Sequence, residues 1–561
     1  MSYDLKIEGA TLVDGSGGPP RRAAIGIRDG RFVAVGDAPE SGARTIDANG
    51  LVAAPGFIDV HTHYDAQLLW DPLATSSCWH GVTTVVTGNC GFSLAPCREA
   101  DRDRLMRMLV VVEGMSLEAL RRGIVWEWET VPEYYGALVR RGLGVNVAPL
   151  VGHSAVRSFV MGEGGWERAA TSNEIARMKE IVRGALRAGA FGFATSQATT
   201  HFGDDNRPVP SRLAADEEIF ALGTVLSEEG RGVIEIAPRS VLGSDTEKRE
   251  DVELFVRLAA ATGRPVSFAP LFAEYHQPGL ALEMIERTVA AAAQGARVYP
   301  QVGCRPLLLR FPLADGPLLK PFDAWQEIAD VPATGRARRL RDPALRQRFL
   351  TEAKDGNIAD ANSHRLFLET ARAESHRSFE GRSLAEIAAE RGSSAFETVL
   401  DLAAEDGLED EYGLVVANGD EETVARLLSH PRGLIALSDA GAHVNMICDA
   451  GYTSTLLEKW VRRLGAMPLE EAVRRLTSMP AEIYGMHDRG RIAPGYAADV
   501  VLFDADRVRA RNPEFVHDLP GGEARLIQRA EGIQFVIVNG RVLLEGDRPS
   551  GDLPGTVLRP S

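Results

Sequence analysis

Residues 55–63 read Pro55-Gly56-Phe57-Ile58-Asp59-Val60-His61-Thr62-His63, a mostly apolar run that ends in two histidines. Residues two apart on a β-strand project to the same face, so His61 and His63 would point the same way. Imidazole nitrogens arranged in this manner can hold one metal ion. Two loop histidines brought together by chance are the alternative. The metal interpretation is favoured because the pair closes a run with the character of a buried strand.

Seven further runs have the same strand-like character. With the first, they give the expected strands 56–62, 83–87, 145–151, 190–196, 232–237, 265–269, 297–302 and 434–438. Helical patterns lie between them at 174–188, 217–229, 251–262, 280–294 and 421–428. Strands that alternate with helices are typical of a parallel sheet, and eight such units close naturally into a barrel. The sequence therefore predicts an α/β fold, a (β/α)8 TIM-like barrel.

The two ends of the chain differ from this middle part. They contain short strands separated by turn dipeptides, among them Asp29-Gly30, Asn49-Gly50 and Asn539-Gly540. Neither end has enough apolar surface to fold alone, so we expect them to share one small β-sandwich. The predicted domains are 1–55 and 487–561 for the two parts of that sandwich and 56–486 for the barrel. An insertion or lid is expected within the barrel at about 304–379.

Composition narrows the class of protein. The 561 residues carry 62 Lys plus Arg against 78 Asp plus Glu, a formal charge of −16, which argues against a nucleic-acid binder. Hydrophobic residues make up 45% of the sequence, enough for a large core. The sequence contains no long uncharged apolar run of the kind that predicts a membrane span. The five cysteines form no C-x-x-C pair and are too few for a disulfide framework. We therefore expect a cytoplasmic protein.

Strand eight would end in Ser438-Asp439, directly beside strand one if the barrel closes. A carboxylate at that place can bind a metal ion and move a proton to or from water. Asp439 could instead cap a helix. We interpret it as both a metal ligand and the catalytic acid/base.

The chain resembles the amidohydrolase superfamily, and within it the N-acyl-D-amino-acid deacylases (D-aminoacylases). The resemblance covers nearly the whole sequence. It rests on the following stretches: 15–36, Pro55 to His63, His80-Gly81-Val82-Thr83-Thr84, Gly88-Asn89-Cys90-Gly91, Val151-Gly152-His153-Ser154, Val298-Tyr299-Pro300, His430-Pro431, Ser438-Asp439 and 490–499. The Gly-Asn-Cys-Gly loop points to the D-aminoacylase branch.

That branch implies that Cys90 supplies a thiolate to zinc. A metal lowers the pKa of a thiol, and the flanking Gly88 and Gly91 let the backbone approach closely. An inert buried cysteine is the alternative. The sequence departs from the branch at the ends of strands five and six, where the metal-binding histidines and a following lysine are absent and Phe272 stands near the place of the lysine. The resemblance therefore implies one zinc ion rather than two, held by His61, His63, Cys90 and Asp439.

Other residues near the expected strand ends are candidates for substrate binding. These are His153, His201, Arg239 and His443, each of which could also be an ordinary loop residue. Glu235 alternates in phase with Ala237 and could replace a missing ligand. Its alternative is a buried carboxylate paired with Arg239.

These observations predict a metal-dependent amidohydrolase that cleaves a C–N amide bond in a small molecule. The alternatives are hydrolysis of a cyclic amide, ester, lactone or carbamate on the same barrel, or a barrel that has lost its metal and its catalysis. We expect no nucleic-acid or membrane partner, and a homo-oligomer as the assembly.

Overall fold

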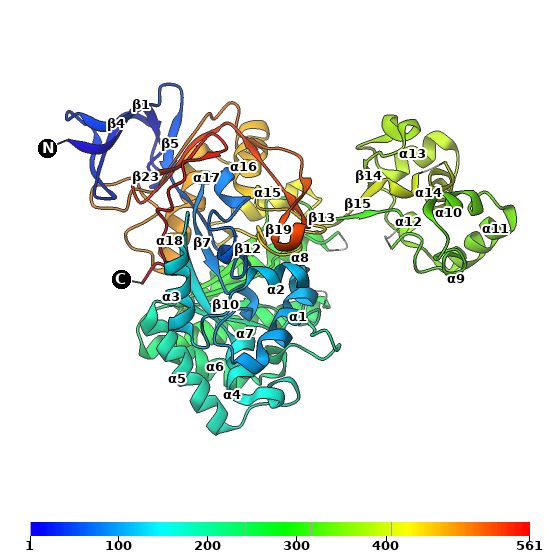
Figure 1. The fold of residues 1–561 in the computed structure, drawn as a ribbon, viewed down its shortest axis with the longest axis horizontal. Helices are drawn as coiled ribbons and strands as arrows, with labels where there is room; N and C mark the ends of the chain where they lie inside the picture. Colours follow the sequence, from blue (N-terminus) through cyan, green and yellow to red (C-terminus); the bar gives the residue numbers. More distant parts are fainter. Residues whose placement is uncertain (1, 242, 276, 315–316, 406, 561) are drawn as a thin grey trace. The chain divides into compact units, whose positions relative to one another are not determined.

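The computed structural model describes residues 2–241, 243–275, 277–314, 317–405 and 407–560. The chain divides into two compact units, one of residues 1–305 with 420–561 and the other of residues 306–419 (Figure 1). The second unit occupies the region of the expected insertion. It continues past the expected end at about 379 as far as Gly419.

An eight-stranded parallel sheet forms the centre of the first unit. Its strands, in sheet order, are β6 (Phe57–Asp59), β7 (Val82–Thr87), β8 (Asn146–Gly152), β9 (Gly192–Ser196), β10 (Val233–Ala237), β11 (Val266–Phe268), β12 (Val298–Val302) and β16 (Leu434–Ile435). Each of the eight coincides with one of the predicted runs, and none extends beyond it by more than one residue at either end. A further parallel bridge between Thr62 and Ala440 links the ends of the first and last strands. The α/β class and the parallel sheet are therefore confirmed.

Helices follow most of these strands. They are α1 (Arg102–Glu113), α2 (Leu117–Gly123), α3 (Val131–Arg141), α4 (His153–Met161), α5 (Ser172–Ala188), α6 (Asp216–Glu228), α7 (Asp245–Thr262), α8 (Pro278–Ala292), α15 (Glu421–Ser429), α16 (Tyr452–Thr455), α17 (Leu469–Leu476) and α18 (Ser478–Tyr484). Local signals explain where some begin and end. Ser244 and Glu247 form a capping box that starts α7, and Gly263 in the left-handed region ends it. Val252, Phe255 and Leu258 then turn the buried face of α7 toward the sheet.

Strands from both chain ends form a nine-stranded sheet in the same unit (blue and red in Figure 1). Its members are β1 (Tyr3–Leu12), β2 (Arg21–Arg28), β3 (Arg31–Gly36), β4 (Gly42–Asp47), β5 (Val52–Pro55), β17 (Val500–Phe503), β22 (Ile533–Val538), β23 (Arg541–Glu545) and β24 (Arg548–Pro549). The two ends meet where β5 pairs antiparallel with β17. Two short antiparallel pairs, β18 (Arg509–Ala510) with β21 (Ala530–Glu531) and β19 (Glu514–Leu519) with β20 (Glu523–Ile527), complete the described strands of this unit.

The second unit has its own core. A three-stranded antiparallel sheet contains β13 (Leu307–Pro312), β14 (Leu366–Thr370) and β15 (Glu411–Ala417), with β15 in the middle. Its helices are α9 (Asp323–Gln326), α10 (Ala333–Arg339), α11 (Pro343–Glu352), α12 (Ile358–Ala361), α13 (Leu384–Arg391) and α14 (Ala395–Ala404). Phe349, Phe396 and Trp325 are among the buried side chains that hold these elements together.

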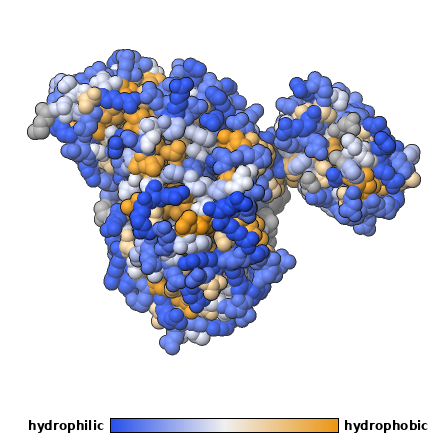
Figure 2. Space-filling model, in the orientation of Figure 1, coloured by the Kyte–Doolittle hydropathy of each residue, from blue (hydrophilic) through white to orange (hydrophobic). Residues whose placement is uncertain are grey.

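The face of the molecule in Figure 2 is mostly hydrophilic, with apolar side chains gathered in separate groups. Among the described residues, no helix combines the length and the apolar character that crossing a bilayer requires.

Candidate metal centre

His61 and His63 stand just past the end of β6. Both rings are buried, and their centroids lie 5.4 Å apart. The chain holds them by pairing with the turn after β16, where the backbone N–H of His63 donates to the carbonyl oxygen of Ala440 at 2.7 Å. The period-two spacing in the sequence therefore brings both imidazoles to one place at the end of the strand.

Cys90 comes from the turn that follows β7. Its own φ is 54°, an unusual value for a residue with a side chain, and Gly88 and Gly91 on either side have φ values of 80° and 76°. A Cβ on Gly88 would lie 2.3 Å from the carbonyl oxygen of Leu150. Glycine is thus required for this turn to fold down onto β8 and present the thiol.

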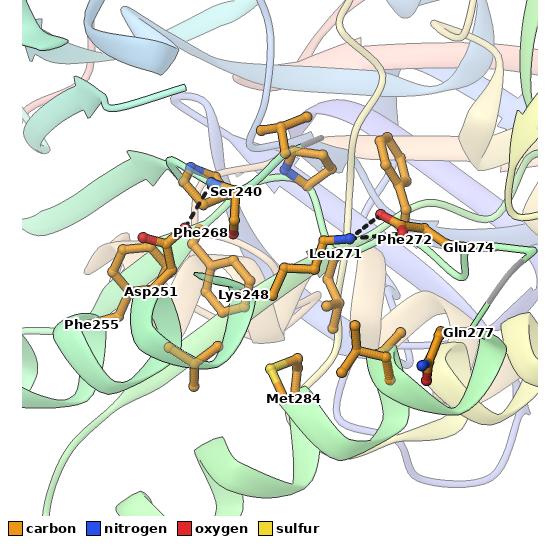
Figure 3. A pocket seen from close by; sticks show the side chains of 16 residues that line it. Ser240, Lys248, Asp251, Phe255, Phe268, Leu271, Phe272, Glu274, Gln277 and Met284 are labelled. Atoms are coloured by element: carbon orange, nitrogen blue, oxygen red, sulfur yellow. Dashed lines mark hydrogen bonds and ion pairs between the residues drawn. The ribbon is translucent and has the colours of Figure 1, made fainter. Parts of the chain in front are cut away.

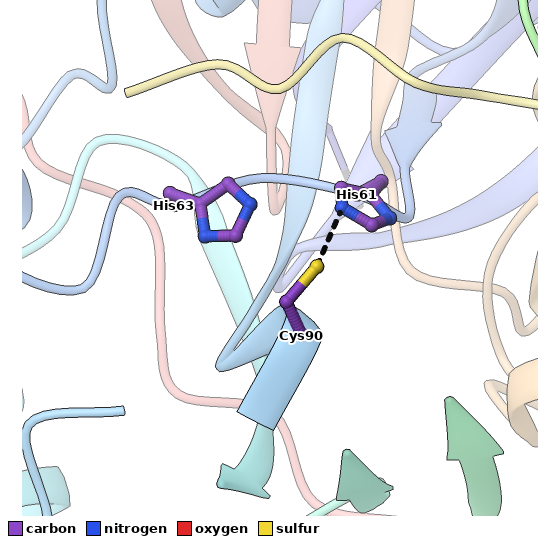
Figure 4. A group of neighbouring side chains, drawn as sticks. All are labelled: His61, His63 and Cys90. Atoms are coloured by element: carbon purple, nitrogen blue, oxygen red, sulfur yellow. Dashed lines mark hydrogen bonds between the residues drawn. The ribbon is translucent and has the colours of Figure 1, made fainter. Parts of the chain in front are cut away.

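The three side chains converge (Figure 4). One ligand atom from each of His61, His63 and Cys90 lies within 4.8 Å of the other two, and the Cys90 sulfur is 3.6 Å from Nε2 of His61. Two imidazoles and one thiol in such a group match the nitrogen and sulfur ligands that zinc prefers.

Asp439 completes the group from the last strand. Regular pairing in β16 ends at Ile435, earlier than the predicted 438, and Leu437 and Asp439 both have positive φ values, 69° and 47°. Oδ1 of Asp439 lies 3.3 Å from Nε2 of His61 and 3.4 Å from Nε2 of His63. Its side chain is 38% exposed, so the carboxylate contacts both rings and also solvent. A strained backbone at such a point is typical of functional sites.

Charge determines the protonation of this carboxylate. Burial acts to raise the pKa of Asp439, but the hydrogen bond from His63 and the charges of His61 and His63 outweigh it and lower the pKa below its usual range. The carboxylate is therefore ionised over the physiological pH range.

Two residues that the sequence did not reveal orient the rings. Oε1 of Gln301, on β12, lies 2.9 Å from Nδ1 of His61, and Oε1 of Glu113, the last residue of α1, lies 3.3 Å from Nδ1 of His63. Because each Nδ1 has a partner, each Nε2 is left to face the thiol and Asp439. Partners of this kind fix the tautomer and the direction of ligating histidines.

Glu235 lies on the other side of the group, fully buried on β10. Its Oε2 accepts a hydrogen bond from the backbone N–H of Cys90 at 2.8 Å, and its Oε1 lies 3.9 Å from Nδ1 of His61. Among the described residues Oε1 has no hydrogen-bond partner. Burial raises the pKa of Glu235 to about 8. The alternative pairing with Arg239 is wrong, because Arg239 bonds to Asp216 on α6.

His153 requires a correction. It begins α4 and is fully buried, with Nδ1 2.8 Å from Oγ1 of Thr195 and Nε2 2.9 Å from Oε1 of Glu218. Arg157 bonds to the same carboxylate. Both ring nitrogens are used inside the protein, so His153 connects α4 to α6 and has no nitrogen to offer a substrate.

The other substrate-binding candidates lie in different surroundings. Nδ1 of His201 forms a hydrogen bond with the hydroxyl of Ser196 at 2.7 Å. Burial lowers the pKa of His201, and the charges of His63 and His443 lower it further. Nε2 of His443 lies 4.0 Å from Oε2 of Glu113. His201 and His443 thus lie near the group formed by His61, His63, Cys90 and Asp439. The side chain of Arg239, in contrast, is 45% exposed at the surface.

A parallel sheet in an α/β fold whose strand ends bring together two histidines, a thiol and a carboxylate is typical of metal-dependent hydrolases. The model of the amidohydrolase family matches residues 44–544, so the chain belongs to the amidohydrolase family.

Known relatives are similar to this chain over nearly its full length. A D-aminoacylase of Alcaligenes xylosoxydans xylosoxydans is 31% identical over 99% of this chain and 97% of its own, and an N-acyl-D-aspartate deacylase of the same organism is 31% identical over 99% and 95%. Among solved structures, an N-acyl-D-glutamate deacylase of Bordetella bronchiseptica, complexed with zinc and a phosphonate inhibitor, has a TM-score of 0.67 at 28% identity and covers both chains completely. A D-aminoacylase with a binuclear metal centre has the same TM-score at 29% identity, covering 99% of this chain and 100% of its own. The predicted resemblance and the amidohydrolase class are confirmed.

Proposed function

We propose that this chain is a zinc-dependent deacylase that cleaves the C–N bond of N-acylated amino acids, with N-acyl-D-amino acids as its first candidate substrates. The observation that carries the proposal is the convergence of His61, His63 and Cys90 with the carboxylate of Asp439 at the ends of three strands. The deacylases that match the chain over its whole length support the substrate class.

The donor set fits a zinc ion. His61, His63 and Cys90 would hold it, and Asp439 would be the fourth ligand. The surroundings also favour a cation, because the buried carboxyl groups of Glu113 and Glu235 and the thiol of Cys90 crowd around two imidazoles. Without a cation, burial raises the pKa of Glu113 to about 8 and that of the Cys90 thiol well above its usual value.

One ion rather than two is supported by strands five and six. Glu235 stands on β10, and Ser267 on β11 accepts a hydrogen bond from Nε2 of Gln301 at 3.1 Å. No histidine occurs on either strand, so a second ion would have fewer nitrogen ligands. The D-aminoacylase noted above is described as activated by one metal and attenuated by the second.

Asp439 is assigned the proton transfers. When bound, zinc supplies a positive charge that polarises the amide carbonyl and makes a nearby water more acidic. The ionised carboxylate of Asp439 accepts the proton of the attacking water and returns it to the leaving nitrogen. Its exposed edge leaves room for water to approach, while Gln301 and Glu113 keep the two imidazoles in place.

His201 and His443 are assigned to the substrate, because both lie beside this group. Since Ser196 occupies Nδ1 of His201, a substrate would meet Nε2. Arg239 retains its predicted substrate role only if its bond with Asp216 opens.

We extend the proposal to the rest of the chain. The Thr62–Ala440 bridge supports closure into a (β/α)8 barrel, and the sheet shared by both chain ends supports a small β-sandwich domain of residues 1–55 and 487–561. Five free cysteines support a cytoplasmic location. A homo-oligomer is our expectation, and sedimentation would test it.

The test is metal content followed by turnover. Protein purified from zinc-supplemented medium should hold about one zinc per chain and hydrolyse some of a panel of N-acyl-D-amino acids, with the L-enantiomers and cyclic amides as comparisons. His61→Ala should lose zinc and activity together, whereas His153→Gln, changed at a histidine outside the centre, should keep its zinc. Zinc-free wild-type protein, or an active and fully occupied His61→Ala variant, would contradict the proposal.

A further inference from the structure

A cavity separate from the metal centre lies on the outer side of the barrel wall. Residues that follow β10 and β11, together with residues of α7 and α8, line this cavity (Figure 3). It encloses about 510 Å³ of empty space, part of it open to solvent. Its lining is mainly apolar and includes Val241, Phe255, Phe268, Leu271, Phe272 and Met284. In a barrel of this kind the ends of the strands form the catalytic face, so the cavity opens on the same face as the metal centre.

Strand β11 separates the cavity from the metal centre by one layer of backbone. Ser267 bonds to Gln301, which bonds to His61, so this residue faces the inside of the sheet. The next residue, Phe268, faces outward and contacts the ring of Phe255 with centroids 5.1 Å apart. Successive side chains of a strand point to opposite faces. Ser267 therefore supports His61 through Gln301, while Phe268 lines the cavity.

The loop after β11 continues this apolar lining. It reads Ala269-Pro270-Leu271-Phe272-Ala273, an apolar stretch at a face where loops normally carry polar residues. Leu271 and Phe272 both line the cavity. Leu271 is buried by the protein itself, whereas Phe272 is partly exposed, so an apolar group of a ligand would cover Phe272.

The polar groups of the lining bind one another. Nζ of Lys248 contacts both carboxylate oxygens of Glu274 at 2.7 Å, and Asp251 accepts hydrogen bonds from the backbone N–H and the hydroxyl of Ser240 (Figure 3). The positive charge of Lys248 is thus matched by a carboxylate. An anionic ligand would have to compete with Glu274 for Lys248 and would face the carboxylate of Asp251, whereas an uncharged apolar group would not.

We propose that this cavity receives an apolar arm of the substrate, an alkyl or aryl group that passes over the end of β11 while the amide lies at the metal centre. The inference deepens the proposed function and rests on it. It names the substrate class as amides with an extended apolar group, on either the acyl or the amino-acid side.

Variants of α8 test the size of the cavity in both directions. Ala281→Leu places a larger side chain in the cavity, and Met284→Ala enlarges it. Ile285→Ala is the matched control, because Ile285 is buried on the same helix but does not line the cavity. Values of kcat/KM are measured for N-acyl-D-alanines from acetyl to decanoyl and for N-acetyl-D-amino acids with side chains of increasing length. Calorimetry with octanoate measures binding to the zinc-loaded protein without turnover.

We expect one of the two series to respond. Ala281→Leu should favour shorter groups and Met284→Ala longer ones, by about fourfold in kcat/KM for each methylene gained or lost. Ile285→Ala should leave the length profile as in the wild type, and octanoate should bind Ala281→Leu more weakly than Ile285→Ala.

Other outcomes would overturn the inference in distinguishable ways. If all variants hydrolysed the substrates with the same dependence on chain length, the apolar arm would not bind in this cavity. The proposed deacylase function would be unaffected. If octanoate binding changed in Ala281→Leu while no zinc-loaded protein hydrolysed any substrate, the cavity would be a site for a free apolar ligand. In that case the proposed function would fail as well.

Discussion

Glu113 offers the sharpest test of how the metal centre is built. Its carboxylate is buried, and its Oε1 lies 3.3 Å from Nδ1 of His63. Glu113→Gln keeps the shape of the side chain and replaces the negative charge with a neutral amide. The imidazole would then face a neutral amide oxygen instead of a carboxylate, and Nε2 would become a weaker ligand.

The size of the effect follows from the contact between the ring of His63 and Glu113, which changes from a charged to a neutral one. Interactions with a charged partner contribute about 1.5–3 kcal/mol and those with a neutral partner about 0.5–1.5 kcal/mol, so we expect the variant to lose about 1–1.5 kcal/mol. At room temperature that corresponds to roughly tenfold weaker zinc binding, at the lower end of the 10–100-fold loss that is usual for such partners. At saturating zinc we expect turnover to recover to within a few-fold, because Asp439 and the three ligands are unchanged.

Zinc affinity is measured by competition with a chromophoric chelator, and kcat is measured separately at saturating zinc. Glu118→Gln is the control, since Glu118 is an exposed residue of α2 that pairs with Arg122. Glu113→Asp retains the charge on a shorter side chain and should fall between the wild type and Glu113→Gln. If Glu113→Gln binds zinc within twofold of the wild type, Glu113 does not support His63 and the reasoning is refuted.

Three further predictions concern other residues. Cys90→Ala should weaken zinc binding more than Glu113→Gln does, since a ligand is lost, and a zinc-bound crystal structure should place the sulfur about 2.3 Å from the ion; a sulfur turned away would exclude the thiolate as a ligand. Asp439→Asn should lower kcat by roughly 10²-fold or more with a smaller change in KM, and zinc content must be measured in the same sample; near-normal turnover with zinc retained would disprove its role as the acid/base. In residues 306–419, the hydrogen bond with Asp410 raises the pKa of buried His376, so the protonated ring stabilises the folded state at low pH and this contribution is lost as pH rises through the raised pKa. The unfolding temperature of this unit should therefore fall as pH rises above about 6.5, the ordinary pKa of histidine, and His376→Gln should remove that part of the slope; an unchanged slope in the variant would contradict the assignment.

The strands and the convergence of the candidate ligands at their ends could be predicted because their signals are local. Hydrophobic runs mark each of the eight strands, and the spacing of His61 and His63 follows from the period of a strand. Gly88 and Gly91 likewise mark the turn of Cys90. Such features depend on neighbouring residues, which any single sequence displays.

The supporting residues could not be predicted, because tertiary packing selects them. Glu113 resembles any other glutamate at the end of a helix until α1 packs against the turn after β16, where the N–H of His443 donates to its carbonyl oxygen at 2.5 Å. His153 was expected at the barrel mouth because it follows a strand. Glu218 on α6 binds its ring in the interior instead.

The pairing of β5 with β17 has a consequence for how the chain is made. Ala54 pairs with Val501, so the first strands emerge from the ribosome long before their partner exists. Until then the apolar edge of β5, with Val52 and Ala53 buried only in the finished sheet, has no neighbour on that side. Contacts between such distant parts of a chain form slowly and leave an open edge exposed to aggregation. Biogenesis of this enzyme should therefore depend on factors that shield nascent chains, and stalled chains that end before residue 500 should be substrates for quality control.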